Sequence, residues 1–456
     1  MRTLILPGAL VFALLAGCQS YERLPLDEAA HKREWQARSA DSQSVRDFAR
    51  ELAARDASPR GTYNPLDGVD LAEAEAIALF FNADLRKARL DAGASLANAQ
   101  NAGAWDNPEL NISGGMILAS ISNPWKAAAA IEFTIPLSGR KGVEKDLAFA
   151  EHSVTWREIM SREWQVLLEL RRLWREHGAT LERAALLRAH LAQVEETGKR
   201  AEDLTNAGEL GRTDARVFAI ELTLRRIELA ELERHSQEQQ IALKGLLGLI
   251  PDAPLTFKPT LAMVQPPAAG ERESKALKNS PEIALARAQY EVAEQQLRLE
   301  IRKQYPDLRL GPGFDVDEGQ STISLGFGIP IPIINLNKQG IAHARAARLA
   351  SRAAFEAECE KLVVALALAQ ARLVRVRAAR DSIETDLAPL VDLQVKEARE
   401  RAALGDFDAL LMLEAFKTQF EAKERVIEAR LQEALAIDEI NGRLGPTFKP
   451  QPTEGK

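Results

Sequence analysis

Few residues of this chain have the type and spacing that catalysis or metal binding requires. The 456-residue sequence contains two cysteines and six histidines, and no two histidines lie four residues apart. Zinc sites need clustered Cys or His ligands, so we expect no bound metal and no other bound cofactor. The sequence also has no Gly-x-x-x-x-Gly-Lys-Ser/Thr loop, so an ATP-driven step does not belong to this chain. We therefore do not expect an enzyme.

The N-terminus has the pattern of a secretion signal followed by a modifiable cysteine. Arg2 precedes an apolar stretch, residues 4–16, which ends in Leu15-Ala16-Gly17-Cys18. Such a stretch is typical of a cleaved signal peptide. Its end resembles a bacterial lipobox, which implies cleavage before Cys18 and covalent lipid on that residue. Gln19 stands where such proteins carry Asp for inner-membrane retention, so we expect an outer-membrane anchor. The alternative is an ordinary signal peptide with an incidental cysteine.

The composition predicts long helices with narrow packed interfaces rather than a large globular core. Hydrophobic residues make up 46% of the chain and charged residues 27%, whereas aromatic residues make up only 5%. This mixture is typical of extended helical packing. The net charge of −7 disfavours a nucleic-acid partner, because phosphate binding needs clustered Lys and Arg. After the N-terminal signal, no run of about 20 apolar residues predicts a membrane-spanning helix.

The sequence contains an internal duplication. Residues 107–110 align with residues 305–308, at an offset of 198, and residues 208–215 align with residues 402–409, at an offset of 194. Residues 82–89 also align with residues 280–287, and residues 133–137 with residues 327–331, so that four matches follow one another in the same order. Each copy is expected to contain a helix, two strands, a very long helix, a Gly turn and a returning helix.

Each copy contains two segments with the alternation of a β-strand. In Ile323–Ile329 every odd-numbered residue is large and apolar, and every even-numbered residue is small or polar. The same period of two runs through residues 110–118, 131–137 and 308–317. About ten residues is the length of a tilted membrane strand with one lipid face and one water face, although a soluble half-buried sheet alternates in the same way. Two isolated hairpins leave open edges, and about eight strands are needed for a membrane barrel, so several chains are expected to contribute.

Two stretches predict very long helices. Residues 142–204 contain no proline and carry apolar residues at helical spacing, and residues 339–404 are interrupted only by Pro389. At 1.5 Å per residue the first stretch spans roughly 95 Å. Each stretch is followed by a Gly turn and a returning helix, residues 214–247 and 409–444. The pattern therefore predicts two antiparallel coiled-coil hairpins.

This arrangement resembles the TolC family of outer-membrane efflux channels over about residues 66–446. Its most specific parts are the duplication, Asn107-Pro108-Glu109-Leu110, and Phe133–Gly142, whose Gly-Arg-Lys-Gly end is most similar to the heavy-metal, CzcC-like branch. The resemblance implies a mixed α/β membrane protein with a long antiparallel coiled-coil α-barrel. It also implies four transmembrane β-strands per chain, which close a 12-stranded β-barrel as a homotrimer.

The resemblance also implies partners and a task. A periplasmic adaptor protein would join the helical tunnel to an inner-membrane pump, and the chain would be the exit duct for metal cations or small toxic compounds. Two alternatives stay open: a channel of the same fold for protein secretion, and a lipid-anchored periplasmic coiled-coil protein that forms no pore.

The resemblance places the adaptor contact at the turns that end the two long helices. In this sequence the candidate contact residues are Gly208, Gly211, Thr213, Asp214, Gly405, Asp406 and Asp408. Asp406 and Asp408 are alternatively caps of the returning helix. Family members often place acidic residues toward the lumen above the second turn; Glu414 matches one such position, whereas Leu411 departs from the other. A ring of Glu414 side chains would attract cations, and a solvated surface position is the alternative.

These observations divide the chain into six segments. We expect a signal peptide at residues 1–17, a lipid-anchored extended tether at 18–68 with a short helix near 46–54, and a first repeat at 69–250. A linker at 251–270, a second repeat at 271–446 and a loose tail at 447–456 follow.

Overall fold

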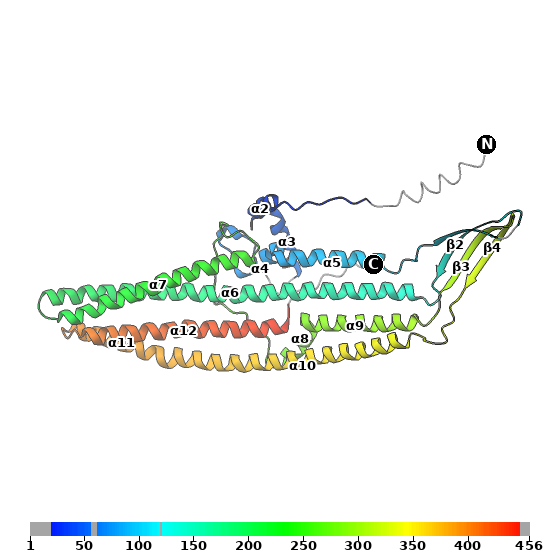
Figure 1. Ribbon diagram of the computed structural model, residues 1–456. Coiled ribbons are helices and arrows are strands. Elements are labelled where there is room, and N and C mark those ends of the chain that lie inside the picture. Colours follow the sequence, from blue (N-terminus) through cyan, green and yellow to red (C-terminus); the bar gives the residue numbers. More distant parts are fainter. Residues whose placement is uncertain (1–19, 56–61, 119–120, 447–456) are drawn as a thin grey trace. The chain divides into compact units, whose positions relative to one another are not determined.

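The computed structural model describes residues 20–55, 62–118 and 121–446, which fall into two compact units divided between Ser39 and Ala40. The first unit contains helix α2 (Glu28–Gln36), whose N-cap Asp27 accepts a hydrogen bond from the backbone N–H of Ala30 at 2.8 Å. The second unit contains all the other elements (Figure 1), so both sequence copies share it. The predicted signal peptide, Cys18 and the predicted tail at 447–456 lie outside the described residues.

The segment predicted as an extended tether is helical over much of its length. It contains α2 and α3 (Gln43–Arg55), followed by a short 3-10 turn, η1 (Pro65–Asp67). α3 packs against α4 (Leu71–Phe81): Val45 is fully buried, and the rings of Phe48 and Phe80 lie 5.5 Å apart. The short helix expected near residues 46–54 is present as α3, in which the apolar residues Val45, Phe48 and Leu52 recur at helical spacing. The extended interpretation was wrong for the residues of α2.

The remaining helices include the two long coiled-coil hairpins. Their bounds are α5 (Ala83–Asn101), α6 (Arg140–Asn206), α7 (Arg212–Leu246), α8 (Ala269–Asn279), α9 (Pro281–Arg302), α10 (Lys338–Ser382), α11 (Ala388–Ala403) and α12 (Ala409–Leu444). α6 packs along α5, α7, α9 and α12, and α12 also packs along α10 and α11 (Figure 1). None of the described helices is long and apolar enough to cross a membrane.

The second long helix breaks where the sequence predicted. A π-helical turn, η2 (Ile383–Leu387), separates α10 from α11, and Pro389 is the second residue of α11. Proline has no N–H and clashes with the carbonyl four residues earlier, so the regular hydrogen-bond ladder is lost there.

The four strands form one sheet in the order β1-β2-β3-β4, with every neighbouring pair antiparallel. They are β1 (Glu109–Met116), β2 (Trp125–Ile135), β3 (Leu308–Asp317) and β4 (Gln320–Gly328). The sequence suggested two isolated hairpins. The structure joins them into one sheet, because β2 of the first copy pairs with β3 of the second. β2 also begins earlier than expected, since the run Ala127–Ala130 has no alternation in side-chain size.

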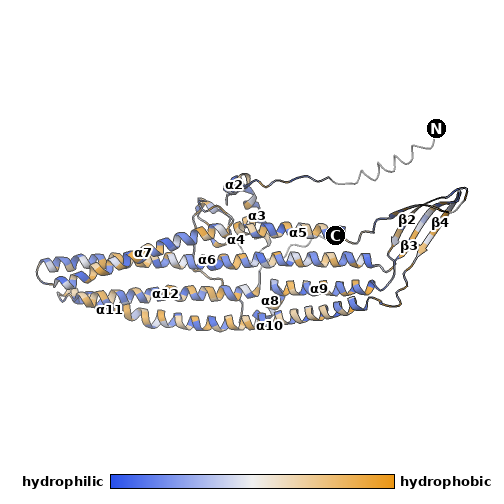
Figure 2. Cartoon of the chain, viewed as in Figure 1, coloured by the Kyte–Doolittle hydropathy of each residue, from blue (hydrophilic) through white to orange (hydrophobic). Residues whose placement is uncertain are grey.

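The buried core is narrow and lies at the interfaces between packed helices. One cluster surrounds Trp174, Leu170 and Leu243, and another joins the ends of the two long hairpins around Phe218 and Phe416. No residue of the four strands is buried. Figure 2 shows hydrophilic and hydrophobic residues interleaved along each long helix.

Candidate functional site

The strand register gathers the large apolar side chains on one face of the sheet. Ile112, Phe314 and Ile323 lie in one row across the sheet, with Ala129 between the first two. The other large side chains of this face are Leu110, Met116, Trp125, Ile131, Phe133, Ile135, Leu308, Leu310, Val316, Leu325 and Phe327. Phe327 is 80% exposed and Ile323 is 84% exposed. An exposed apolar surface of this kind marks contact with lipid or with another protein.

The opposite face of the sheet is small, polar and mildly acidic. Its uncharged residues are mostly Gly, Ala, Ser and Thr, such as Ser113, Ala128, Gly313 and Ser324. Its charged residues are Glu109, Lys126, Glu132, Arg309, Asp315 and Asp317. Lys126 Nζ lies 2.6 Å from Asp317 Oδ2, and Arg309 lies 3.7 Å from Glu132. Because the face holds four carboxylates and only two cationic side chains, it carries a net negative charge.

The Gly-Arg-Lys-Gly element fixes the junction between helices and strands. Arg140 Nη2 lies 2.9 Å from Asp307 Oδ2, just before β3. Lys141 Nζ lies 3.2 Å from Asp106 Oδ1, just before β1. The start of α6 therefore holds the chain where it enters a strand in both sequence copies.

The predicted turn residues lie at the ends of the two long hairpins and have different local roles. Gly208 and Gly405 adopt positive φ angles of 79° and 95°, which glycine accepts without steric strain. Asp408 caps α12 by accepting a hydrogen bond from Leu411 N at 3.0 Å, and Asp406 instead accepts one from Arg401 Nε at 3.0 Å. The cap alternative is therefore confirmed for Asp408 and wrong for Asp406.

The first turn is built from the three other candidates. Gly211 takes the N-cap position of α7 in an extended conformation, and the first helical turn contains both Asp214 and the exposed Thr213. Contact of these turns with an adaptor stays a prediction. The helices that lead into the two turns are linked, because Arg200 of α6 donates to the carbonyl of Ala402 of α11 at 3.2 Å.

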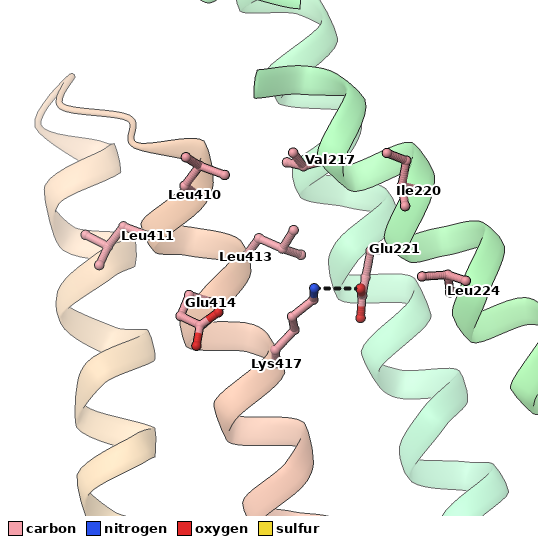
Figure 3. Close-up of a pocket in the computed structure, with 9 residues that line it drawn as sticks. All are labelled: Val217, Ile220, Glu221, Leu224, Leu410, Leu411, Leu413, Glu414 and Lys417. Carbon is pink, nitrogen blue, oxygen red and sulfur yellow. Dashed lines mark ion pairs between the residues drawn. The ribbon is translucent and has the colours of Figure 1, made fainter. Parts of the chain in front are cut away.

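Glu414 lines a cavity of about 660 Å³ between α7 and α12 (Figure 3). The cavity is lined by Val217, Ile220, Glu221, Leu224, Leu410, Leu411, Leu413, Glu414 and Lys417. Glu414 is exposed, and its carboxylate makes no ion pair with any residue that the structure describes. Leu411 lines the same cavity, so both positions compared with the TolC family lie together. A role of Glu414 in the lumen stays a prediction.

A buried ionic cluster beside this cavity was missed from the sequence. The carboxylate of Glu221 is 2.8 Å from Arg225 Nε and 3.0 Å from Lys417 Nζ, which reaches across from α12 (Figure 3). His190 Nε2 of α6 lies 3.6 Å away, and its ring stacks at 4.7 Å on Phe420. Glu221 is only 3% exposed. Three helices therefore meet around one carboxylate.

Within this ionic cluster, burial and the neighbouring charges shift the pKa values of Glu221 and His190. Burial opposes ionisation of Glu221, but hydrogen bonds from Arg225 and Lys417 outweigh burial and lower the pKa of the carboxyl group. Burial and the nearby Arg225 lower the pKa of His190. The spacing of Glu221 and Arg225 is visible in the sequence, whereas Lys417 and His190 come from distant segments.

Known proteins provide two kinds of comparison. No family model matches the sequence. The chain is 28% identical over 244 residues to the cobalt-zinc-cadmium resistance protein CzcC of Cupriavidus metallidurans, which covers 52% of this chain and 58% of that protein. The match thus spans little more than half the length of this curated relative.

Solved structures match over most of the chain. A membrane protein from Pseudomonas aeruginosa superposes with a TM-score of 0.70 at 20% identity, covering 82% of this chain and 90% of that one. CusC superposes with a TM-score of 0.68 at 15% identity, covering 83% and 93%. At this level of identity the likeness establishes the fold.

Together the matches define the fold and a partial likeness to one curated relative. The chain has the mixed α/β fold of outer-membrane channels, with long helices and a four-stranded antiparallel sheet. The resemblance to the TolC family, and within it to the CzcC-like branch, is confirmed by the CzcC match and the structural likeness.

Proposed function

We propose that this protein is an outer-membrane channel, the exit duct of a tripartite efflux system. The observation that carries the proposal is the sheet with one continuous apolar face and one small, polar face. Lipid matches the first face and water matches the second. The sheet has four strands, and β1 and β4 are its edges, so a closed barrel requires other chains. Three copies supply twelve strands, which is the homotrimer that the family resemblance implies.

The helical hairpins extend this duct on the periplasmic side. We propose that their turns meet a periplasmic adaptor protein and, through it, an inner-membrane pump that supplies the energy. This assignment is supported by the likeness to outer-membrane channels and by the packing of both turns into one cluster. A covalent lipid on Cys18 would add an anchor in the same membrane. Such a duct performs no chemical reaction, which agrees with the channel proteins that the fold matches.

Metal cations are the cargo that we favour. The curated relative is a cobalt-zinc-cadmium resistance protein, and the polar face of the sheet carries four carboxylates against two cationic side chains. A lumen of net negative charge raises the local concentration of cations. Protein secretion remains the second use of the same fold, but no described feature favours it specifically.

Extraction and electrophoresis test the proposal against a coiled-coil protein that forms no pore. The expected protein requires detergent for solubility and runs as a heat-modifiable trimer, because the exposed apolar face needs lipid or detergent. Removal of Cys18 by a Cys18→Ala substitution separates anchoring from insertion: the variant without lipid still requires detergent. A variant that is soluble and monomeric without detergent would contradict the barrel.

A further inference from the structure

A second cavity lies at the junction between helices and strands. It has a volume of about 510 Å³ and is formed by the first turns of α6 and the last turns of α9. Its lining includes Asp146, Gln295, Arg298, Arg302 and Tyr305. Tyr305 is three residues before β3, so the cavity lies at the base of the sheet.

The polar groups of this cavity lack partners. Arg298 and Arg302 are exposed one helical turn apart on α9, and neither pairs with a carboxylate of the described residues. Asp146 of α6 likewise makes no ion pair with any residue that the structure describes. These charges are thus free to bind a ligand that carries charges of both signs.

Gln295 supplies an independent sign of a ligand. Its side chain is only 8% exposed, and its Nε2 donates to Glu291 at 2.6 Å. Its Oε1 is buried and accepts no hydrogen bond from any described residue. A buried acceptor without a donor costs free energy, so a native structure normally provides a donor for it.

The surroundings of the cavity indicate the kind of ligand. Ile301 is 36% exposed and Tyr305 is 57% exposed, so apolar and aromatic surface borders the charged groups. Phe149, one turn beyond Asp146, is 37% exposed. Aromatic residues beside arginines are typical of the level where hydrocarbon ends and lipid headgroups begin.

We propose that this cavity binds the headgroup of a lipid with a phosphodiester and a primary ammonium, as in phosphatidylethanolamine. Arg298 and Arg302 hold the phosphate oxygens with charge-assisted hydrogen bonds. Asp146 and Gln295 Oε1 accept hydrogen bonds from the ammonium. The assignment rests on the proposed function, because the sheet must be in a membrane for the cavity to meet headgroups.

The arrangement predicts selectivity among headgroups. Phosphatidylcholine carries a quaternary ammonium without N–H donors, so it leaves Gln295 Oε1 unpaired. Phosphatidylglycerol offers hydroxyl donors but no cation for Asp146. Inorganic phosphate engages only the two arginines.

Native mass spectrometry of the detergent-solubilised full-length protein tests the proposal. The protein is titrated separately with short-chain phosphatidylethanolamine, phosphatidylcholine, phosphatidylglycerol and inorganic phosphate. We expect phosphatidylethanolamine to bind about tenfold or more tightly than the others. The double substitution Arg298→Gln/Arg302→Gln abolishes this binding, and Asp146→Asn reduces phosphatidylethanolamine to the level of phosphatidylglycerol. Arg375→Gln, at an exposed arginine of α10, is the matched control and leaves binding unchanged.

Three results would overturn the proposal: equal binding of phosphatidylethanolamine and phosphatidylglycerol, unchanged binding in the double variant, or phosphate that binds as tightly as lipid. Trimer state and conductance are measured on the same samples. Loss of headgroup selectivity in a protein that still forms conducting trimers overturns only the lipid site. A protein without trimers or conductance overturns the proposed function itself.

Discussion

Replacing Lys417 by methionine should loosen the contact between the two long hairpins. The substitution keeps an unbranched side chain of similar length but removes the ammonium that lies 3.0 Å from Glu221. Glu221 is buried, so its carboxylate cannot replace this partner with bulk water. The loss therefore acts on α7 and α12 together.

The expected size follows from the remaining partners. Removing one member of a buried ion pair costs about 3–5 kcal/mol when the other charge is left alone. Here Arg225 stays bonded to Glu221 at 2.8 Å, and the Lys417 side chain is 35% exposed. The loss should be closer to one charge-assisted hydrogen bond, about 2 kcal/mol. That free energy corresponds to a roughly 30-fold loss of protection from amide exchange.

Hydrogen exchange monitored by mass spectrometry measures this effect in peptides that cover residues 215–226 and 410–422. The control is Lys423→Met on the same helix, because Lys423 forms a more exposed pair with Asp392 at 3.8 Å. Such surface pairs contribute little, so the control should change exchange by less than about threefold. A Lys417→Met variant that exchanges like the control would refute the role assigned to the buried cluster.

Four further outcomes are expected. The exchange protection of the hairpin ends should fall as the pH is lowered from 7 to 5, because the folded protein favours neutral His190 whereas the unfolded chain takes up a proton there below the ordinary histidine pKa of 6.5. The substitution His190→Phe should remove this pH-dependent loss of protection. A pH profile that the substitution leaves unchanged would contradict the role of His190. Asp408→Ala should cost about 1 kcal/mol by removing the cap of α12, seen as faster exchange in its first turn only. Gly405→Ala should cost about 1 kcal/mol through its positive φ alone, since no neighbouring atom lies within 4 Å of the added Cβ; a thermal midpoint equal to wild type would argue against that conformation. Glu414→Gln should lower the cation-to-anion permeability ratio about twofold in bilayer recordings, whereas an unchanged reversal potential would remove Glu414 from the conduction path.

The sequence predicts much of this fold because its patterns are local. The alternation in Ile323–Ile329 and the long proline-free stretch from residue 142 each reflect a period within one element, and both elements form as expected. The duplication gave the remaining order. Asp408 as a helix cap is also a local property and could be foreseen, whereas Asp406 depends on how the turn directs it toward Arg401.

The missed features depend on contacts between distant segments. β2 pairs with β3 across 173 or more residues of sequence, as in Ile135 opposite Leu308, which no local pattern reveals. The cluster around Glu221 needs His190 and Lys417, whose sequence positions carry no shared signal. The cavity at Gln295 depends in the same way on α6 and α9 lying side by side.

Ion conductance in a planar lipid bilayer tests the central claim most directly. Purified trimers of the detergent-solubilised protein are added to one side, and single-channel steps are recorded under a salt gradient. The proposed channel predicts discrete, uniform conductance steps with a reversal potential on the cation-selective side. Well-folded trimers that insert but give anion-selective steps would contradict the acidic lumen, and a protein that neither inserts nor needs detergent would contradict the channel.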